Sequence, residues 1–541
     1  MDHDCEVLVV GAGPVGLTLG IDLARRGVAV TVIDRRPTAD PLTVRCNHVS
    51  SRSMETFRRL GLAEAVRAAG FSDDFPHDAA FRTTVTGQEF ARIPIPGRAG
   101  RRDGAPGPDT WWPTMEPPHR VNQMFLEPVM IDHARATPGL TLRFDTELAD
   151  FTQDDSGVTA TLRGGDGTTS TLRAAFLAGC DGGASGVRKA IGGTLVGDPV
   201  VQRVQSSFIH APGLTARMQA PPAWAYVALN PRRSGTLYTI DEEDRFLVHN
   251  YLRPDETDFD AIDRDAAIRT ILGVGPDFAY SILRNEDWIG RRLIADRIRA
   301  GRVFLAGDAA HIWVPYAGYG MNAGIADATD LAWLLDAVLK GWGGPGMLDA
   351  YSAERLPITE QVSRFAMDHA EKMIRNRGAV PGEIEDDTPE GAAARARFGQ
   401  LCYDVNVNQY CCAGLNFGYF YDASPIIVPD GATPPAYSMG SFTPSTVPGC
   451  RAPHVVMPDG TSLYDHLGPG YTLLRRDDRG GTGLAAAATA LGVPLATVDL
   501  PPDAGYDVAL ALARPDAHVA WRGDGDPSDP AALIARLAGR A

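Results

Sequence analysis

A glycine-rich turn near the N-terminus constrains the fold more than any other feature of this chain. A mostly apolar run, residues 5–10, is followed by Gly11-Ala12-Gly13-Pro14-Val15-Gly16 and a helical pattern through Arg26. A second apolar run, Val28 to Ile33, ends in Asp34. Such glycines let the backbone approach a pyrophosphate, the helix N-terminus binds it, and the acid accepts hydrogen bonds from ribose hydroxyls. The pattern predicts a Rossmann-like α/β fold with a dinucleotide site, and does not distinguish NAD from FAD.

A second strand–turn–helix pattern lies at residues 301–341. The apolar run Val303 to Leu305 leads into Gly307-Asp308, and a helix with apolar residues at helical spacing ends at Gly341. A carboxylate at Asp308 can hydrogen-bond a polyol, and Gly320 lets the backbone approach a ligand closely. The helix N-terminus near Met321-Asn322 favours an anion. This combination suits a flavin, because its ribityl chain is a polyol and its reduced ring is negatively charged.

A third strand end carries Asp181-Gly182, followed by a helix that opens near Ser185 and includes Arg188. Taken alone, this pattern has two readings. It is either a ligand-binding turn or an Asx-type turn whose side chains only cap the helix, since Asp and Ser often do this.

Composition limits the function classes. With 51 basic and 67 acidic residues the net charge is −16, which argues against nucleic-acid binding. The seven cysteines form no CxxC and no metal-ligand spacing, and their odd number indicates a reducing compartment. No signal peptide is recognised at the N-terminus, and no apolar run reaches about 18 residues. We expect a cytoplasmic enzyme with no metal, no membrane span and about three domains.

Together the three elements resemble the class A flavoprotein monooxygenases, the single-component aromatic hydroxylases, over most of the chain. Within that family the chain is similar to the phenol, chlorophenol, hydroxybiphenyl and polyketide hydroxylases, also in segments 415–422 and 514–522. In relatives, the first arginine of the segment after the second strand touches the cofactor, which implies this role for Arg45. The residues expected to bind FAD are Gly11, Gly13, Pro14, Val15, Gly16, Asp34, Arg35, Arg45, Gln123, Leu148, Asp181, Arg188, Asp308, Gly320, Met321 and Asn322.

The resemblance also implies the chemistry. NADH or NADPH reduces FAD, reduced FAD reacts with O2 to a C4a-hydroperoxide, and an oxygen atom is transferred ortho or para to a phenolic hydroxyl. The other GxGxxG match, residues 341–346, follows a helical pattern and not a strand, which fits a family without a separate nicotinamide domain. Two departures from the family pattern concern flavin movement: Pro315-Tyr316 replaces a Pro-Pro pair, and a lysine common in the following helix is absent.

The residues expected to contact an aromatic substrate are less strongly indicated. The candidates are His48, Asn47, Pro315, Tyr226 and Tyr238, with His249 as a further hydrogen-bond donor. His48 lies on a segment that passes close to the flavin ring in relatives, and the carbonyl of Pro315 lies beside the hydroperoxide there. For Tyr226, Tyr238 and His249 an ordinary half-buried core role is the simpler alternative. His311 is expected to pack or cap rather than catalyse.

We expect a glutathione-reductase-type FAD domain in three pieces, residues 1–75, 105–185 and 290–400. An antiparallel-sheet substrate domain is expected at 76–104 and 186–289, and 375–396 is read as a surface excursion. Residues 425–541 resemble a thioredoxin-like domain, which without CxxC has a structural or oligomer-supporting role and is compatible with a homodimer.

Three other functions compete with hydroxylation. Baeyer–Villiger oxygenation or epoxidation of a polyketide or aromatic metabolite is possible on the same scaffold. A flavin-dependent halogenase is disfavoured, because no WxWxIP-like segment is present. A non-enzymatic FAD-binding protein would bind flavin without substrate-stimulated NAD(P)H oxidation.

Overall fold

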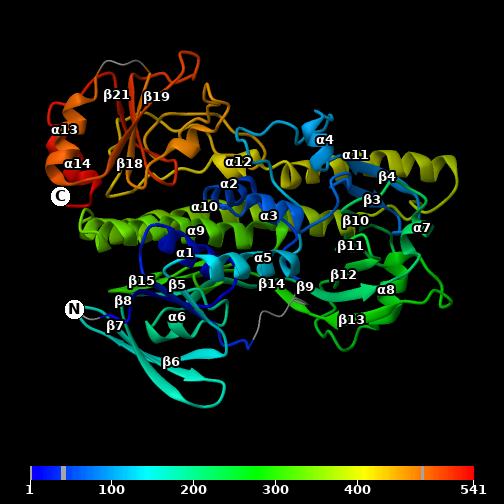
Figure 1. Cartoon of the computed structure of the whole chain (residues 1–541). Coiled ribbons are helices and arrows are strands. Elements are labelled where there is room, and N and C mark those ends of the chain that lie inside the picture. The colour runs from blue at the N-terminus through cyan, green and yellow to red at the C-terminus, as the bar shows by residue number, and fades with distance from the viewer. Residues whose placement is uncertain (1–2, 38–43, 477–479, 541) are drawn as a thin grey trace.

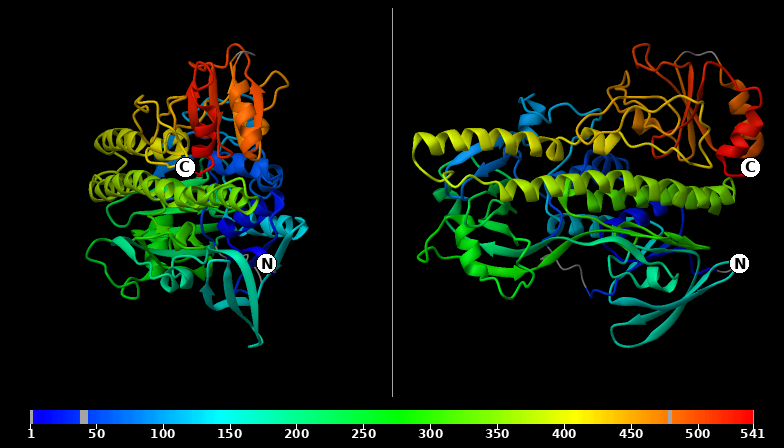
Figure 2. Two further views of the ribbon diagram at one scale, coloured as in Figure 1. Left: turned by 90° about the vertical axis from the view of Figure 1, so that its left-hand side faces the viewer. Right: turned by 180° about the vertical axis from the view of Figure 1, so that it is seen from behind.

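The computed structural model describes residues 3–37, 44–476 and 480–540. This part of the chain forms three β-sheets around a layer of long helices (Figure 1). The first sheet lies on one side of the helix layer, near the N-terminus, and the C-terminal sheet lies on the other. The second sheet lies at the far end of the molecule from both termini, as the view from behind also shows (Figure 2).

The first sheet has the strand order β15-β16-β8-β1-β2-β5, and an antiparallel extension, β7 and β6, continues from β8. Its central strand β1 pairs in parallel with β2 and β8, and Val7, Leu8 and Val9 are completely buried. Continuous apolar runs of this kind are typical of parallel strands covered on both faces. The strands are β1 (Cys5–Val10), β2 (Val30–Ile33), β5 (Leu140–Arg143), β6 (Thr146–Gln153), β7 (Val158–Gly164), β8 (Thr169–Gly179), β15 (Arg299–Ala300) and β16 (Val303–Leu305).

The second sheet has the order β17-β14-β9-β12-β11-β10-β3-β4, with β13 paired to β9. Its pairs are antiparallel except for β3 with β10. One face packs under α8 (Arg264–Leu272), and the other meets α11 (Pro389–Tyr410). The strands are β3 (Ala79–Arg82), β4 (Glu89–Ile93), β9 (Leu195–His210), β10 (Ala225–Ala228), β11 (Gly235–Thr239), β12 (Arg245–Tyr251), β13 (Ser281–Asn285), β14 (Trp288–Ala295) and β17 (His311–Ile312).

The C-terminal sheet has the order β19-β18-β20-β21, with β18 and β19 parallel. One face joins the main core, where Tyr471 packs edge-on against Trp333 of α9 at 6.2 Å. The elements are β18 (Tyr471–Arg475), α13 (Thr482–Leu491), β19 (Leu495–Asp499), β20 (Leu510–Ala513), β21 (Val519–Gly523) and α14 (Pro530–Leu537).

Two helices, α9 (Tyr319–Leu339) and α10 (Pro345–Gly378), pack against each other between the first and the C-terminal sheets (Figures 1 and 2). Helix α9 also packs on α1, which follows β1. The other helices are α1 (Pro14–Arg25), α2 (Ser51–Arg59), α3 (Ala63–Ala68), α4 (Arg98–Arg102), α5 (Gln123–Ala136), α6 (Gly186–Ala190), α7 (Leu214–Met218), α12 (Ala413–Phe417) and the short 3₁₀ turns η1 (Gly307–Ala309), η2 (Tyr316–Gly318) and η3 (Leu463–His466).

A buried ionic contact fixes the C-terminal sheet on α10. Arg514, just after β20, donates to both carboxylate oxygens of Glu354 at 2.6 and 2.8 Å. It also donates to Asp516 at 2.7 and 3.1 Å, and all three side chains are completely shielded from solvent. Because a charge is buried at acceptable cost only when it is paired, this cluster ties the position of the C-terminal domain to α10.

The segment 375–396, predicted as a surface excursion, is mostly exposed and is helical at both ends. Helix α10 continues to Gly378, and α11 starts at Pro389 with the side chain of Thr388 capping its N-terminus. Residues 379–388 connect the helices. The proline at the start of α11 fits this, because proline is favourable at a first helical position. Among the described residues, no helix is long and apolar enough to cross a membrane.

Candidate active site

The first glycine-rich turn has the tight geometry that its sequence predicted. Gly11 has φ +108°, and a Cβ on Gly16 would lie 1.9 Å from the Gly11 carbonyl oxygen. A Cβ on Gly13, in contrast, meets no atom within 4 Å. Helix α1 starts at Pro14 without a side-chain cap. Gly11 and Gly16 are thus required by the fold itself, whereas Gly13 leaves open space beside an uncapped helix N-terminus, where an anion fits.

Asp34 lies at the end of β2, and its carboxylate accepts a hydrogen bond from the Ala12 backbone N–H at 2.8 Å. Arg36, which sequence reasoning missed, donates to the same carboxylate at 3.1 Å and to Glu127 of α5 at 3.1 Å. Arg35 instead has an exposed side chain.

The loop that contains Gly307-Asp308 and extends to Asn322, here named the GD loop, lies against this turn. A Cβ on Gly324 of α9 would come within 2.6 Å of a Val15 methyl and 2.9 Å of the Gly307 Cα. Gly307 itself has φ +62°. The absence of side chains at these two glycines lets α1, α9 and the GD loop meet at close range.

Asp308 projects from the GD loop with an exposed side chain, and no described residue hydrogen-bonds its carboxylate. Although the side chain is accessible, protein atoms around it displace part of its hydration and so raise the pKa of Asp308, and the charges of His311 and Arg45 oppose that shift. Arg45, also exposed, therefore lies within electrostatic reach of Asp308. A carboxylate without a protein partner, beside a cation, is free to bind hydroxyl groups.

Behind the GD loop, Asp327 of α9 accepts three hydrogen bonds or ion pairs. They come from the Gly307 N–H at 3.0 Å, His311 Nε2 at 2.7 Å and Arg355 Nε at 2.7 Å. Burial raises the pKa of Asp327, but His311 and Arg355 outweigh it and the net shift is downward. His311 thus supports the loop, as the sequence suggested, and Asp327 was missed because nothing local distinguishes it from other helix acids.

Asn322 connects the GD loop to the segment that starts at Arg45. Its side chain accepts from the Ser50 N–H at 2.8 Å and donates to the carbonyls of His48 (3.0 Å) and Gly318 (2.6 Å). The side chain of Asn322 is therefore used by the protein, and its backbone N–H lies at the helix position that donates to the Gly318 carbonyl. The first turn of α9, which includes Gly320 and Met321, has no side-chain cap and therefore presents free N–H groups.

Gln123, a predicted FAD ligand, and Asn47, a predicted substrate contact, make contacts that fix local structure. The Gln123 side chain donates to Glu127 at 2.5 Å within α5, and its backbone N–H donates to the Cys46 carbonyl at 2.9 Å. The side-chain oxygen of Asn47 accepts a hydrogen bond from Asn122, the N-cap of α5. These contacts hold the Arg45 segment against the N-terminus of α5.

The Asp181-Gly182 turn behaves as a helix cap. Asp181 accepts from the Ser185 hydroxyl at 2.5 Å and from the N–H groups of Gly186 and Val187 at 2.7 and 3.2 Å. Arg188 is buried and donates to the Ala309 carbonyl at 3.0 Å. Of the two readings of this turn, helix capping accounts for the contacts of Asp181. Arg188 connects the turn to the GD loop. Leu148 lies on β6, packed against the main core.

The candidate substrate residues separate onto two faces of the second sheet. Tyr238 lies opposite Leu247 and Ala225, on the same face as His249, and its ring is 5.1 Å from Trp224 and 5.3 Å from His249. Tyr226 lies opposite Leu237 on the other face, packed in the core under α8, and its hydroxyl accepts from the Ala223 N–H. Because successive strand residues alternate, Tyr226 does not face the same side as Tyr238. The prediction of Tyr226 as a substrate contact is corrected accordingly.

The face that carries Tyr238 meets the GD loop. Interactions with Tyr251, Tyr410 and Tyr316 add to the burial that raises the pKa of Tyr238, and Tyr316 belongs to the GD loop. Pro315 is exposed, and its carbonyl accepts from the Gly318 N–H at 3.1 Å.

His48 is buried beside the same loop. A Cβ on Gly318 would lie 2.9 Å from the His48 Cβ, and His48 Nδ1 is buried without a hydrogen-bond partner. Burial, with a smaller contribution from Arg120, holds the pKa of His48 well below 6.5, so the ring is neutral at physiological pH. A neutral imidazole can accept a hydrogen bond from a phenol.

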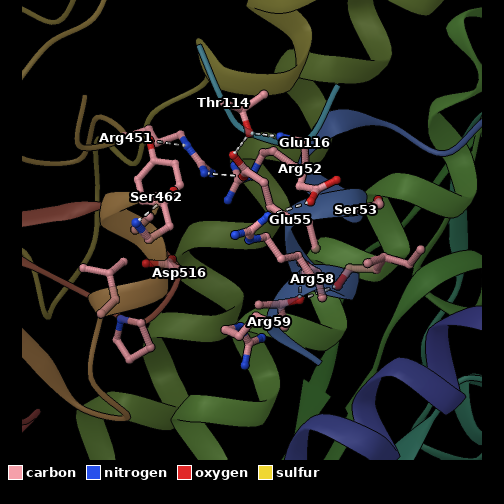
Figure 3. A pocket seen from close by; sticks show the side chains of 18 of the residues that line it. Arg52, Ser53, Glu55, Arg58, Arg59, Thr114, Glu116, Arg451, Ser462 and Asp516 are labelled. Atoms are coloured by element: carbon pink, nitrogen blue, oxygen red, sulfur yellow. Dashed lines mark hydrogen bonds and ion pairs between the residues drawn. The ribbon is translucent and has the colours of Figure 1, made fainter. Parts of the chain in front are cut away.

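A separate pocket lies between α2, α9 and the C-terminal domain, and of the residues discussed above only Asn322 and Asp516 line it (Figure 3). Its charged residues mostly pair with one another: Arg451 with Glu55, and Arg58 with Asp465 and Glu116. The glycine-rich turn and Asp308 do not line this pocket. It is therefore distinct from the site that the sequence motifs form.

The residues that come together fit FAD. Gly13 leaves space beside the uncapped α1, Asp308 has an unengaged carboxylate, and the uncapped α9 begins next to it. The space beside α1 suits a pyrophosphate, and the carboxylate of Asp308 suits the hydroxyls of a ribityl chain. The start of α9 suits an anionic flavin ring. No group of three or more metal-ligating side chains occurs in the described part of the chain, and all seven cysteines are free thiols.

Comparisons with known proteins agree with this site. Residues 4–366 match the family model described as an FAD binding domain, and residues 445–541 match that of the aromatic-ring hydroxylase C-terminal region. The FAD-dependent monooxygenase apdD of Emericella nidulans is 31% identical over 98% of this chain and 90% of that protein. Aklavinone 12-hydroxylase RdmE of Streptomyces purpurascens is 33% identical over 98% of both. The structure of the rebeccamycin biosynthetic enzyme RebC with reduced flavin has a TM-score of 0.90 and 32% identity, over 99% of both chains.

Proposed function

We propose that this chain, which belongs to the FAD-dependent aromatic-ring hydroxylases, adds one oxygen atom to a polycyclic aromatic substrate that carries a phenolic hydroxyl. The chain is an FAD-dependent monooxygenase with the mixed α/β fold and thioredoxin-like C-terminal domain that its sequence predicted. NADH or NADPH is the expected reductant, and O2 the second substrate. The proposal of a polycyclic substrate rests on relatives such as aklavinone 12-hydroxylase and on the lining of the site.

The observation that carries the proposal is the aromatic surface opposite the GD loop. Trp224, Tyr238 and His249 form a continuous series of ring contacts on one sheet face, and Tyr410 of α11 adds a perpendicular ring 6.1 Å from Trp224. Tyr316 approaches from the GD loop. Flat, offset aromatic surfaces pack well against fused rings, and buried hydroxyls on them fix the orientation of a ligand.

The protein's part in the reaction follows from these positions. When bound, FAD supplies the reducing equivalents and the activation of O2. Asp308 and the N-terminal N–H groups of α9 hold and orient the cofactor. His48 Nδ1 accepts a hydrogen bond from the substrate hydroxyl and thereby increases electron density on the ring. The aromatic surface excludes water from the reacting atoms.

The test is NAD(P)H oxidation by the purified holoenzyme with a panel of phenols and aromatic polyketides, with product masses measured in parallel. We expect stimulated oxidation with a product gain of one oxygen and an intact ring system. One oxygen gained with a ring opened or expanded would replace hydroxylation by Baeyer–Villiger chemistry. A flavin-loaded protein stimulated by no member of the panel would contradict the proposal.

Two tyrosine variants make the test specific to the site. Tyr238→Phe is expected to raise the KM for the best substrate severalfold, because a hydroxyl on the substrate-facing side is lost. Tyr226→Phe, on the opposite face, is the matched control and is expected to leave KM unchanged. Equal effects of the two changes would show that the Tyr238 face does not bind the substrate.

A further inference from the structure

Arg120 is a buried cation without a counter-ion. Its side chain is 4% exposed, and no hydrogen bond or ion pair connects its guanidinium to the described residues. Its contacts are instead with ring faces, Trp224 at 4.3 Å and Tyr410 at 5.9 Å. Cation–π contacts offset only part of the cost of removing a charge from water. A lone buried guanidinium is therefore a costly feature that the fold alone does not explain.

Asp109 is the acid whose charge acts on Arg120, but it makes no hydrogen bond or ion pair with it. Arg101 binds one oxygen of the Asp109 carboxylate at 2.6 Å, and the other oxygen is buried without a partner. Arg101 and Asp109 cancel each other, so one positive charge remains. Since arginine stays protonated in proteins, this charge persists at any physiological pH.

The imidazoles around Arg120 supply no negative charge but do supply hydrogen-bonding groups. His48, His77 and His119 all have their pKa lowered by burial and, to a smaller extent, by neighbouring cations that include Arg120. His119 has both ring nitrogens buried without a partner, and His48 has one. The neutral His119 ring therefore keeps one unused N–H donor, and a cation beside such a donor is complementary to an anion.

The position of Arg120 relates it to the proposed reaction. Its charge acts on His48 and Cys46, which lie on the segment bound to the GD loop. Arg120 also stacks on Trp224, whose ring contacts Tyr238, and the Tyr238 ring in turn contacts His249. Arg120 thus lies where the aromatic surface of the second sheet meets the GD loop, and not on the exterior.

We propose that Arg120 binds a carboxylate of the substrate, so that this enzyme acts on aromatic carboxylic acids. The inference rests on the proposed hydroxylase function and narrows its substrate class. The planar fork of arginine matches a carboxylate with two parallel hydrogen bonds, and a carboxylate is already ionised at neutral pH. Arg120 holds the anion while the rings of the substrate lie along Trp224 and Tyr238.

The first experiment compares two probes on the holoenzyme, 3-hydroxy-2-naphthoate and its methyl ester, with binding measured by perturbation of the flavin absorbance. The acid is expected to bind wild type more tightly than the ester. Arg120→Gln is expected to weaken binding of the acid about 10- to 100-fold, because one charge-assisted contact is lost. The affinity for the ester is expected to change less than about threefold. Arg120→Lys should weaken binding of the acid by an intermediate factor. Equal affinity of acid and ester for wild type, or equal losses in the variant, would overturn the proposal.

A second measurement needs no ligand and is independent of turnover. Arg120→Met removes the uncompensated charge while keeping the stack on Trp224, so the thermal midpoint of the holoenzyme is expected to rise. The control is Arg101→Met, which breaks the ion pair with Asp109 and is expected to lower the midpoint. A lower midpoint in Arg120→Met would show that the guanidinium serves packing, and would overturn the proposal. A rise in Arg120→Met, together with the absence of any stimulated NAD(P)H oxidation by wild type, would instead contradict the proposed hydroxylase function alone.

Discussion

Substitution of Glu354 by Gln is expected to loosen the C-terminal domain from the rest of the protein. Glu354 on α10 receives two hydrogen bonds from Arg514, at 2.6 and 2.8 Å, where both side chains are completely buried. The amide of Gln has nearly the volume of the carboxylate but no charge, and it offers one acceptor where Arg514 needs two. Arg514 is then paired only with Asp516.

The size of the effect follows from the burial. Removing one partner of a fully buried ion pair costs about 3–5 kcal/mol when the other ion is left unpaired. Arg514 keeps Asp516 as its counter-ion in this variant, so the expected loss lies below that range. Glu147→Gln is the matched control, since Glu147 pairs with Arg163 on the surface, where the side chains are 45% and 53% exposed. Exposed pairs contribute about 0–1 kcal/mol.

The assay is urea unfolding of the holoenzyme followed by tryptophan fluorescence, together with limited proteolysis of the C-terminal domain. Glu354→Gln should lower the unfolding midpoint and release a C-terminal fragment sooner, while Glu147→Gln should match wild type. If the two variants have equal midpoints and equal cleavage rates, the Glu354–Arg514 contact does not hold the domain, and the reasoning is refuted.

Three further predictions concern the cofactor site and acid stability. Asp308→Ala should lower FAD retention in gel filtration without changing the circular dichroism spectrum, because its carboxylate has no protein partner; a variant that keeps its flavin with unchanged affinity contradicts the Asp308 assignment. Gly16→Ala should destabilise even the apoprotein, since its Cβ would lie 1.9 Å from the Gly11 carbonyl oxygen. Gly13→Ala should change only the affinity for FAD, because a Cβ there meets no atom within 4 Å. Equal unfolding midpoints of the two apoproteins would refute this. Burial acts to raise the pKa of Asp22, but Arg26 and Arg59 lower it to about 2 in the folded protein. The ionised carboxylate therefore contributes about 2 kcal/mol to the free energy of unfolding. This contribution should be present above about pH 4 and be lost as the pH falls toward 2. Asp22→Asn should flatten that part of the stability profile measured by urea unfolding, and an unchanged acid slope would count against the pair.

Local sequence predicted the motifs well because their chemistry is local. A turn with φ +108° at Gly11, an uncapped helix at Pro14 and a strand that ends at Leu305 depend on the residues of one short segment. The family resemblance supplied what these segments bind, and the family models agree with it.

Roles that depend on partners distant in sequence were not predictable in this way. Arg36 binds Glu127, 91 residues later in the chain, and Asp327 binds the Gly307 N–H twenty residues earlier. Tyr226 and Tyr238 read alike in sequence, but the register of β10 on β11 places them on opposite faces.

The sequence by itself therefore determined which segments become strand, turn or helix, and which ligand chemistry the glycine-rich turns suit. Only the tertiary structure decided which charges are neutralised. Glu354 and Arg514 are 160 residues apart and form a buried pair, whereas Arg120 is buried beside Trp224 with no counter-ion. The physical reason is that backbone geometry depends on neighbours along the chain, while the free energy of a charge depends on everything packed around it in space.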